Sequence, residues 1–426
     1  MAGRLLLSKI VGGSLVGPAG DHVGRVADCV VRLADAEGPL VTGIVLQVDQ
    51  RDTFVPTEDL AALESGRVRL AVDKVGTRPF ERRPGEVLLV RDVRGRGVVD
   101  VGAPRLVRVG DVVLEGEGVS WHVVAIVPAP AASLGKLVRR LVGQDGKGTE
   151  AIPWPRIEPL MGHVPSARQR ISLPRLNALR PADIADIVEQ ASHEEGQEIL
   201  QAVHEDQELE ADVFEELADD HQLEFLRDRS DAEVAAVLGN MAADDAADLL
   251  MQLDQERRRP VLELLPVAQQ RKVQLLLGYN PETAGGLMTP EFVALPEELS
   301  AGEALQRLRA LGEVPETLTE VYSLAEERLS GSISLAQLIR SDPASRLADL
   351  VRSDPVAVHP DADIPSVALH MADYNLSALP VVDEASSLLG VITYDDIIEA
   401  MLPTEWRWRG RPGQAEIHRQ GSSSST

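Results

Sequence analysis

The stretch from residue 230 to residue 265 repeats with a period of 12 residues: "SDAEVAAVLGNM" (230–241), "AADDAADLLMQL" (242–253) and "DQERRRPVLELL" (254–265). Each unit offers a cap or Pro start and one acidic turn, followed by two or three apolar residues. Twelve residues make about three helical turns, too few for a helix that stands alone. Such helices must stack on their neighbours, so the repeat predicts a superhelical array.

The same pattern extends upstream through "RPADIADIVEQA" (180–191) and "SHEEGQEILQAV" (192–203). We therefore expect the α-helical superhelix to cover residues 173–278. This segment contains 9 basic and 25 acidic residues. Its regular Leu, Val and Ala positions argue against disorder, because they provide apolar surface to bury.

Residues 1–160 have the pattern of a β region. Short Val- and Leu-rich runs such as "VGRVADCVVRL" (23–33) and "RLVRVGDVVL" (105–114) alternate with glycine turns. This spacing predicts one or more small β-barrels. A short helix is expected at "GKLVRRLVG" (135–143), and "AIPWPRIEPLMGHVP" (151–165) is typical of an extended linker.

A second repeat, of a different kind, lies within residues 279–402. "SGSISLAQLI" (330–339) corresponds to "LGVITYDDII" (389–398). Each copy predicts strand, helix, strand, strand, helix, which gives two modules at 279–347 and 348–402. The tail 403–426 is polar and is expected to be disordered. The predicted fold class is multi-domain α+β: N-terminal small β-barrels, a central helical superhelix and a C-terminal βαββα pair.

The formal net charge of −26 is unevenly distributed. Residues 1–172 carry a net +3, and the remainder carries −29. A field of that sign repels nucleic acid and anionic membranes and attracts cations. The single cysteine, Cys29, excludes an intrachain disulfide. No run approaches 18 apolar residues, and the N-terminus lacks a signal-peptide pattern, so we expect a cytoplasmic protein without a membrane span.

"YNPETAGGLMTP" (279–290), with the helical repeat before it, resembles the cytosolic part of MgtE-type magnesium transporters over residues 173–402. "SALPVVDEASSLLGVITYDDIIEAM" (377–401) is similar to the CBS signature, so the βαββα pair would be a tandem CBS pair. Residues 1–160 resemble PRC-barrel modules, as in "FVPTEDL" (54–60). The family's CBS pair leads into a membrane pore, whereas this sequence continues into a Trp/Arg-rich, serine-ended tail, so ion conduction is not carried over.

The resemblance implies a magnesium sensor, in which acidic residues of the helical domain and the CBS pair face each other and Mg²⁺ neutralises the gap. Mg²⁺ prefers oxygen ligands and keeps several waters, so acidic clusters suit it. The candidate metal ligands are Asp244, Asp245 and Asp248 in the array and Asp395, Asp396 and Glu399 in the second CBS module. A structural alternative stays open, because first-turn carboxylates also cap helices and complement the helix dipole. The acidic run 204–220 is typical of a solvated face.

Thr393 and Asp396 have a second interpretation. In CBS modules that bind adenine nucleotides, the matching residues would hold a ribose, so the resemblance implies ATP or AMP as an alternative ligand. The first module has Ser334 but Gln337 where an aspartate is expected. Thr393 and Asp396 could equally cap the following helix. "TAGGLM" (283–288) lacks the continuation of a phosphate loop and is expected to make a turn with close backbone approach.

No catalytic constellation is present in the sequence, so we do not expect an enzyme. The leading interpretation is a non-catalytic, magnesium-responsive regulatory protein. The alternatives are a soluble component that acts on a separate magnesium transport pore in a membrane protein, and an adenine-nucleotide sensor. A homodimer through the CBS modules is also expected, with Val367, Leu369 and Met371 offered by residues 362–375.

Overall fold

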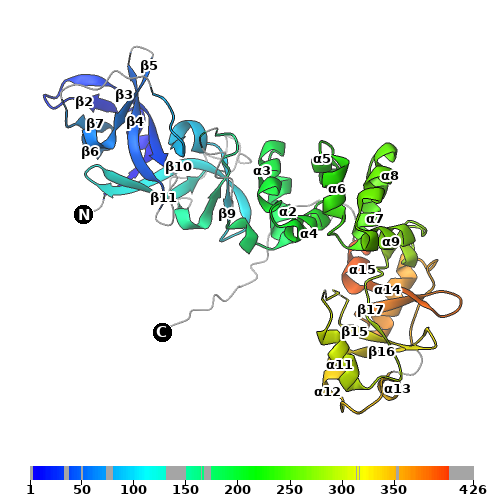
Figure 1. The fold of residues 1–426 in the computed structure, drawn as a ribbon. Coiled ribbons are helices and arrows are strands. Elements are labelled where there is room, and N and C mark those ends of the chain that lie inside the picture. Colours follow the sequence, from blue (N-terminus) through cyan, green and yellow to red (C-terminus); the bar gives the residue numbers. More distant parts are fainter. Residues whose placement is uncertain are drawn as a thin grey trace, which may run out of the picture. The chain divides into compact units, whose positions relative to one another are not determined.

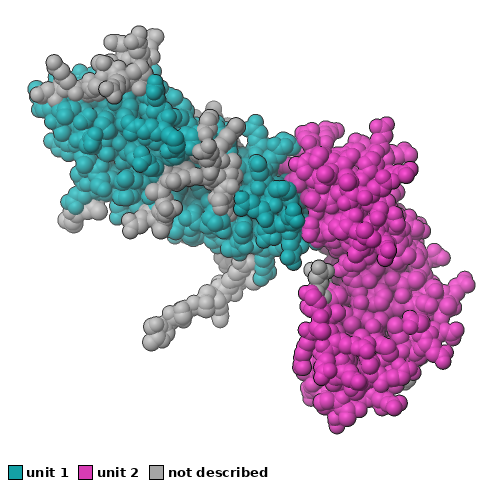
Figure 2. All heavy atoms as spheres, in the orientation of Figure 1, with its two compact units in different colours: residues 1–216 teal, residues 217–426 magenta. Residues whose placement is uncertain are grey.

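The computed structural model describes residues 3–32, 38–48, 51–72, 80–130, 150–164, 166, 174–312, 314–315, 317–351 and 355–402. The chain divides into two compact units, residues 1–216 and 217–426 (Figure 2). The helix expected at 135–143 and the tail 403–426 lie outside the described residues.

The first part of unit 1 is a β region (Figure 1). Its strands are β1 (Gly3–Leu6), β2 (Ser14–Val16), β3 (His22–Arg32), β4 (Leu40–Val48), β5 (Arg51–Pro56), β6 (Leu60–Glu64), β7 (Arg67–Leu70), β8 (Glu86–Leu88), β9 (Gly97–Asp100), β10 (Arg105–Glu117), β11 (Ser120–Pro128), β12 (Ile152–Pro153) and β13 (Ile157–Pro159). Single helical turns interrupt them: α1 (Leu7–Ile10), η1 (Thr57–Asp59), η2 (Leu89–Val93) and η4 (Trp154–Arg156).

These strands form one strongly curved sheet in the order β13-β9-β10-β11-β4-β3-β2-β7-β6, with β1 on β10, β12 on β11, β5 on β4 and β8 on β3. A continuous core lies inside, where alternate side chains such as Ile44, Val68 and Ile126 have no exposed surface. The predicted β content of the N-terminal region is therefore confirmed. Its identity with PRC-barrel modules stays a prediction.

The segment expected to be an extended linker, residues 151–165, instead completes the sheet. β12 pairs with β11, and β13 pairs with β9. The reason is apolar burial, because Ile152, Trp154 and Ile157 are all at most 6% exposed. Pro153 and Pro159 each end a short strand that pairs with one neighbour only, and such edge strands tolerate proline.

Unit 1 continues with η6 (Leu176–Ala178), α2 (Pro181–Gln190), α3 (His193–Val203) and α4 (Gln207–Glu216). The first turn of α3 is joined to the β region. The Arg108 guanidinium donates to both Glu195 carboxylate oxygens at 2.7 and 3.0 Å, and the Gly97 amide donates to the same carboxylate. Because bidentate arginine–carboxylate pairs fix geometry, these contacts position α3 on the sheet.

Unit 2 begins with the array helices α5 (Asp219–Leu226), α6 (Asp231–Leu238), α7 (Ala243–Gln252), α8 (Gln255–Leu264) and α9 (Val267–Leu276). Their first residues follow one another at intervals of 12, as the repeat predicts. α6 packs on α8, and α7 packs on α9, so alternate helices stack (Figure 1). Ser230 and Glu233 form a capping box at the start of α6. The expected stacked helices are thus confirmed.

"TAGGLM" forms the one-turn helix α10 (Ala284–Leu287) against the C-terminal module. The Gly285 amide donates to the Pro360 carbonyl oxygen. A Cβ on Gly286 would lie 2.5 Å from the Asn280 carbonyl oxygen, a distance that side chains do not tolerate. The glycine therefore permits the close backbone approach that the sequence predicted.

The C-terminal part of unit 2 contains the two predicted modules. The first has β14 (Ala294–Pro296), α11 (Ala301–Arg309), β15 (Glu320–Ala325), β16 (Arg328–Ser334) and α12 (Leu335–Arg340); α13 (Leu347–Leu350) follows it. The second has α14 (Ile364–Tyr374), β17 (Ala378–Val382), β18 (Leu388–Thr393) and α15 (Tyr394–Met401), and a single bridge at Val358 replaces its first strand. None of the described helices is both long and apolar enough to cross a bilayer.

The apolar side chains expected at the dimer surface divide between two environments. Val367 and Met371 are at most 4% exposed and pack inside the module, whereas Leu369 is 63% exposed. The expectation that all three are offered to a partner is therefore wrong for two of them. The helix period explains it, because positions 367 and 371 share one face of α14 and position 369 lies on the opposite face.

Candidate functional site

The aspartates of α7 are the first group of predicted metal ligands. Asp244 and Asp245 lie in the first turn of a helix whose N-cap residue, Ala242, has no side-chain acceptor. Carboxylates there complement the positive end of the helix dipole. Asp245 is exposed and Asp244 is half-buried. This local arrangement is compatible with both interpretations, the cap and the ligand.

Asp248, one turn further along α7, lies near Asp219 in the first turn of α5. Although Asp248 is at the surface, desolvation by its neighbours and then the negative charge of Asp219 raise its pKa to about 6. Ionisation of Asp248 is thus less favourable than ionisation of a free aspartate, and a nearby positive charge would favour it. Sequence reasoning missed Asp219, because the run 204–220 was interpreted as a solvated face. The 12-residue period gives no signal for this approach, because it does not say which helices pack on each other.

In the single chain, the predicted carboxylates do not converge on one point. Across the described ranges, no three His, Cys, Asp or Glu side chains are close enough to hold a metal ion together. Mg²⁺ often contacts only one or two carboxylates and keeps its waters, so a site of that kind needs fewer direct ligands. The assignment of Mg²⁺ to the two predicted clusters stays a prediction.

The second cluster lies at the junction of β18 and α15. Asp395 and Glu399 are exposed, one turn apart on α15. Asp396 is half-buried, and its carboxylate accepts hydrogen bonds from the Thr393 amide and hydroxyl, which makes a capping box. Burial raises the pKa of Asp396, and the Thr393 hydrogen bonds oppose that shift. Thr393 and Asp396 therefore lie together as a hydroxyl–carboxylate pair, and they cap α15 in the chain without a ligand.

The corresponding position of the first module is already occupied by an internal contact. The Ser334 hydroxyl accepts a hydrogen bond from the backbone amide of Gln337. The side-chain amide of Gln337 donates to the Leu350 carbonyl oxygen at 2.8 Å. Gln337 has no carboxylate to offer to a ribose. The two modules thus differ as the sequence predicted, with the hydroxyl–carboxylate pair in the second.

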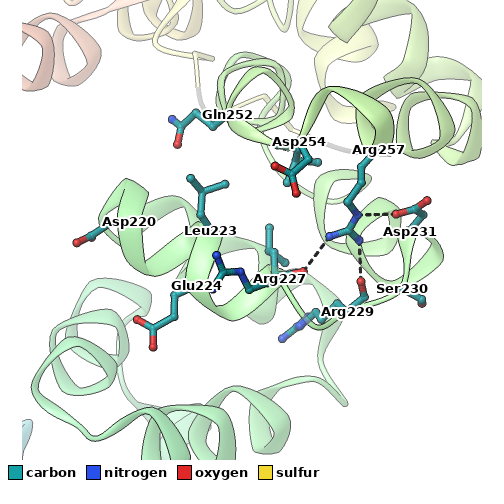
Figure 3. A pocket seen from close by; sticks show the side chains of 12 residues that line it. Asp220, Leu223, Glu224, Arg227, Arg229, Ser230, Asp231, Gln252, Asp254 and Arg257 are labelled. Atoms are coloured by element: carbon teal, nitrogen blue, oxygen red, sulfur yellow. Dashed lines mark hydrogen bonds and ion pairs between the residues drawn. The ribbon is translucent and has the colours of Figure 1, made fainter.

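A pocket of about 780 Å³ lies beside the acidic array, between the α5–α6 and α7–α8 turns (Figure 3). Arg257 of α8 forms its wall. The guanidinium pairs with Asp231 at 2.7 Å and donates to the carbonyl oxygens of Leu226 and Arg229 (Figure 3). Arg257 thus joins α8 to the α5–α6 turn. The remaining charged lining, which includes Asp220, Glu224 and Arg227, is of mixed sign and favours no single class of ligand.

Comparison with known proteins agrees with this arrangement. Residues 179–282 match the family described as MgtE intracellular N domain, and residues 347–403 match the CBS domain. A crystal structure described as the cytosolic domain of the Mg2+ channel MgtE in complex with ATP is 31% identical, with a TM-score of 0.52, over 55% of this chain and 97% of that chain. The chain belongs to the family of the MgtE cytosolic domain.

Two curated relatives give the same result. The magnesium transporter MgtE of Thermus thermophilus is 34% identical over 195 residues, which is 45% of this chain and 43% of that protein. The MgtE of Enterococcus faecalis is 35% identical over 131 residues, which is 30% of this chain and 29% of that protein. The chain thus spans less than half the length of these relatives. The MgtE likeness covers the array and the CBS pair, which contain every residue of the candidate site.

Proposed function

We propose that this chain is a non-catalytic, magnesium-responsive regulatory protein of the MgtE type. In this proposal Mg²⁺ binds weakly at the acidic surface of the array and the CBS pair. Binding compacts the two parts, and loss of the ion lets them separate. The relatives are magnesium transporters, which supports Mg²⁺ as the ion.

The observation that carries the proposal is the pair Asp219 and Asp248. Burial raises the pKa of Asp248 most, and the negative charge of Asp219 raises it further, so the two carboxylates lie near enough to repel each other. Like charges this near each other repel, and salt weakens the repulsion only in part where the groups are partly desolvated. A divalent cation would remove it. Asp219 lies in the first turn of α5, where a carboxylate complements the helix dipole, but Asp248 lies beyond the first turn of α7 and does not have that role.

The test is a millimolar Mg²⁺ titration of the wild type and of Asp244→Asn/Asp245→Asn/Asp248→Asn. Asn caps helices nearly as well as Asp, so helix stability changes little. If the aspartates hold the ion, the variant is more compact without Mg²⁺ by small-angle scattering, and its melting temperature responds less to Mg²⁺. A tenfold loss in ion affinity corresponds to about 1.4 kcal/mol.

The matched control is Glu326→Gln/Glu327→Gln/Glu384→Gln, which removes the same charge from turns of the CBS modules. It should respond to Mg²⁺ as the wild type does. Ionic strength is held constant with sodium, because screening alone also relieves repulsion. Identical titration curves for the wild type and the triple Asn variant would show that the array aspartates are caps and not ligands.

A second candidate, adenine-nucleotide sensing, is favoured by one observation. Thr393 and Asp396 form a hydroxyl–carboxylate pair suited to a ribose diol, and the similar MgtE cytosolic domain was crystallised with ATP. The same titration with ATP or AMP in place of Mg²⁺ separates the two candidates. The third, a component that acts on a separate transport pore, is distinguished by co-purification with a membrane protein.

A further inference from the structure

The β region contains one succession of elements twice. Module A is residues 3–70, and module B is residues 80–164. Each has a short first strand, one helical turn, a short strand, two long antiparallel strands and a final pair of short strands around another turn. In order, β1, α1, β2, β3, β4, β5, η1 and β6 correspond to β8, η2, β9, β10, β11, β12, η4 and β13. β7 is an addition in module A.

The first strand of each module pairs with the long strand of the other module. β1 of module A lies antiparallel on β10, and β8 of module B lies antiparallel on β3. Between β1 and β10 the Cα partners are Leu6 with Val113, Leu5 with Leu114 and Arg4 with Glu115. Between β8 and β3 they are Leu88 with Val30, Val87 with Val31 and Glu86 with Arg32. When Asp28 is aligned with Asp111, the two registers coincide residue for residue, so the exchange is reciprocal.

Each long strand also caps the first turn of the other module. Asp28 of β3 accepts a hydrogen bond from the Val90 amide in η2 at 2.8 Å. Asp111 of β10 accepts one from the Ser8 amide in α1 at 3.1 Å. Ser8 and Val90 are both the second residue of their turn. Because free amides at a helix start need an acceptor, each module supplies a cap that the other lacks.

The exchanged turns are buried in a single core. Leu7 and Ile10 of α1, and Leu89 and Val93 of η2, are at most 2% exposed and belong to one cluster that spans both modules. The corresponding strands β4 and β11 meet through Leu40 and His122, so equivalent elements of the two modules also contact each other. One cluster of buried apolar side chains thus runs through both modules.

We propose that residues 3–164 are an internal pseudo-dimer, in which two related β modules complete each other by reciprocal strand exchange. The surface between them is a self-recognition surface. This surface binds a partner that offers a short strand followed by one helical turn, and that partner is another copy of the module. The β region therefore acts as one body, and a module that loses its companion binds a second module of the same kind.

The test pairs two engineered disulfides in the full chain. Arg4→Cys/Glu115→Cys and Glu86→Cys/Arg32→Cys both join directly opposite Cα positions, a separation that a disulfide spans. Both should oxidise readily and leave a single-chain product on a non-reducing gel. The control, Arg4→Cys/Glu117→Cys, places the second thiol two residues further along β10 and should not close. Closure of one pair but not the other would overturn the reciprocal exchange, and products of two linked chains would overturn its internal character.

A second measurement does not depend on new thiols. A protease site inserted within residues 73–79 separates module A from the rest of the chain after cleavage. The two fragments should remain together through size exclusion without denaturant, and separation under those conditions would overturn the proposal. The double variant Asp28→Ala/Asp111→Ala should raise the dissociation constant of the two fragments at least tenfold. Glu58→Ala, which removes an exposed acid of module A, should leave it unchanged. Equal dissociation constants for the two variants would contradict the mutual capping.

Discussion

Asp28 shows how one buried carboxylate can set a pH dependence. Its side chain is 2% exposed, and its oxygens accept from the amides of Cys29, Val90 and Arg91. Burial raises the pKa of Asp28 from 3.8 to about 6, against the effect of these hydrogen bonds, and the nearby Asp92 raises it further. Asp28 therefore supports η2 at a cost in charge burial.

The sign of the pH effect follows from proton binding. Between about pH 4 and pH 6 the folded state keeps a proton on Asp28 that the unfolded state has lost, so the free energy of unfolding falls as pH rises through this window. Over this window the free energy of unfolding changes by at most about 3 kcal/mol through Asp28. Asp28→Asn removes this titration. The melting temperature of the wild type, measured by calorimetry, should therefore exceed that of the variant by more at pH 4.5 than at pH 7. Asp21→Asn, an exposed turn residue, is the control; a constant difference for Asp28→Asn would refute the shift.

Helix α8 shows that two arginines of one element contribute differently. The Arg257 side chain is 20% exposed and joins Asp231 and two carbonyl oxygens of the α5–α6 turn. The Arg259 side chain is 87% exposed and pairs with Glu263 on its own helix. Because removal of Arg257 leaves partners without a donor, Arg257→Met should destabilise the array by about 2 kcal/mol. Arg259→Met should leave the stability of the array nearly unchanged, because exposed ion pairs contribute little.

Hydrogen exchange of the α6 and α8 peptides measures this difference. Faster exchange in Arg257→Met than in Arg259→Met is expected, since the array stabilises each helix through its neighbours. Equal exchange in the two variants would mean that stacking of the apolar faces, and not the arginine, joins the α5–α6 turn to α8.

The same elements show what the sequence could and could not predict. The period of 12 places the starts of α6 to α9 correctly, because local helix length and apolar spacing determine it. The period does not reveal that Asp219 approaches Asp248 or that Arg257 reaches the α5–α6 turn, since both depend on how alternate helices pack. Residues 151–165 were misassigned for a related reason: prolines indicate interrupted helices, but they do not exclude short paired strands.

For the whole molecule, the remaining expectation is a homodimer through the CBS pair. α14 and α15 pack against each other and expose apolar side chains on their outer surfaces: Leu369, Tyr374, Tyr394, Ile398 and Met401 are 39–63% exposed. Exposed apolar groups gathered on adjacent helices are typical of an interaction site. With Val367 and Met371 turned inward, the surface on α14 depends on Leu369 and Tyr374.

Leu369→Glu with Ile398→Glu should therefore shift the chain towards a monomer in sedimentation velocity at micromolar concentration, because each charge would have to be desolvated in the interface. Val267→Glu is the matched control. Val267 is 65% exposed and belongs to α9, not to α14 or α15, and its substitution should leave the mass unchanged. A monomeric wild type at every concentration, or a dimer that survives the double substitution, would show that α14 and α15 face another partner or solvent. Repeating the measurement with Mg²⁺ tests whether ion binding and self-association are linked, since any ligand that favours the dimer must also bind it more tightly.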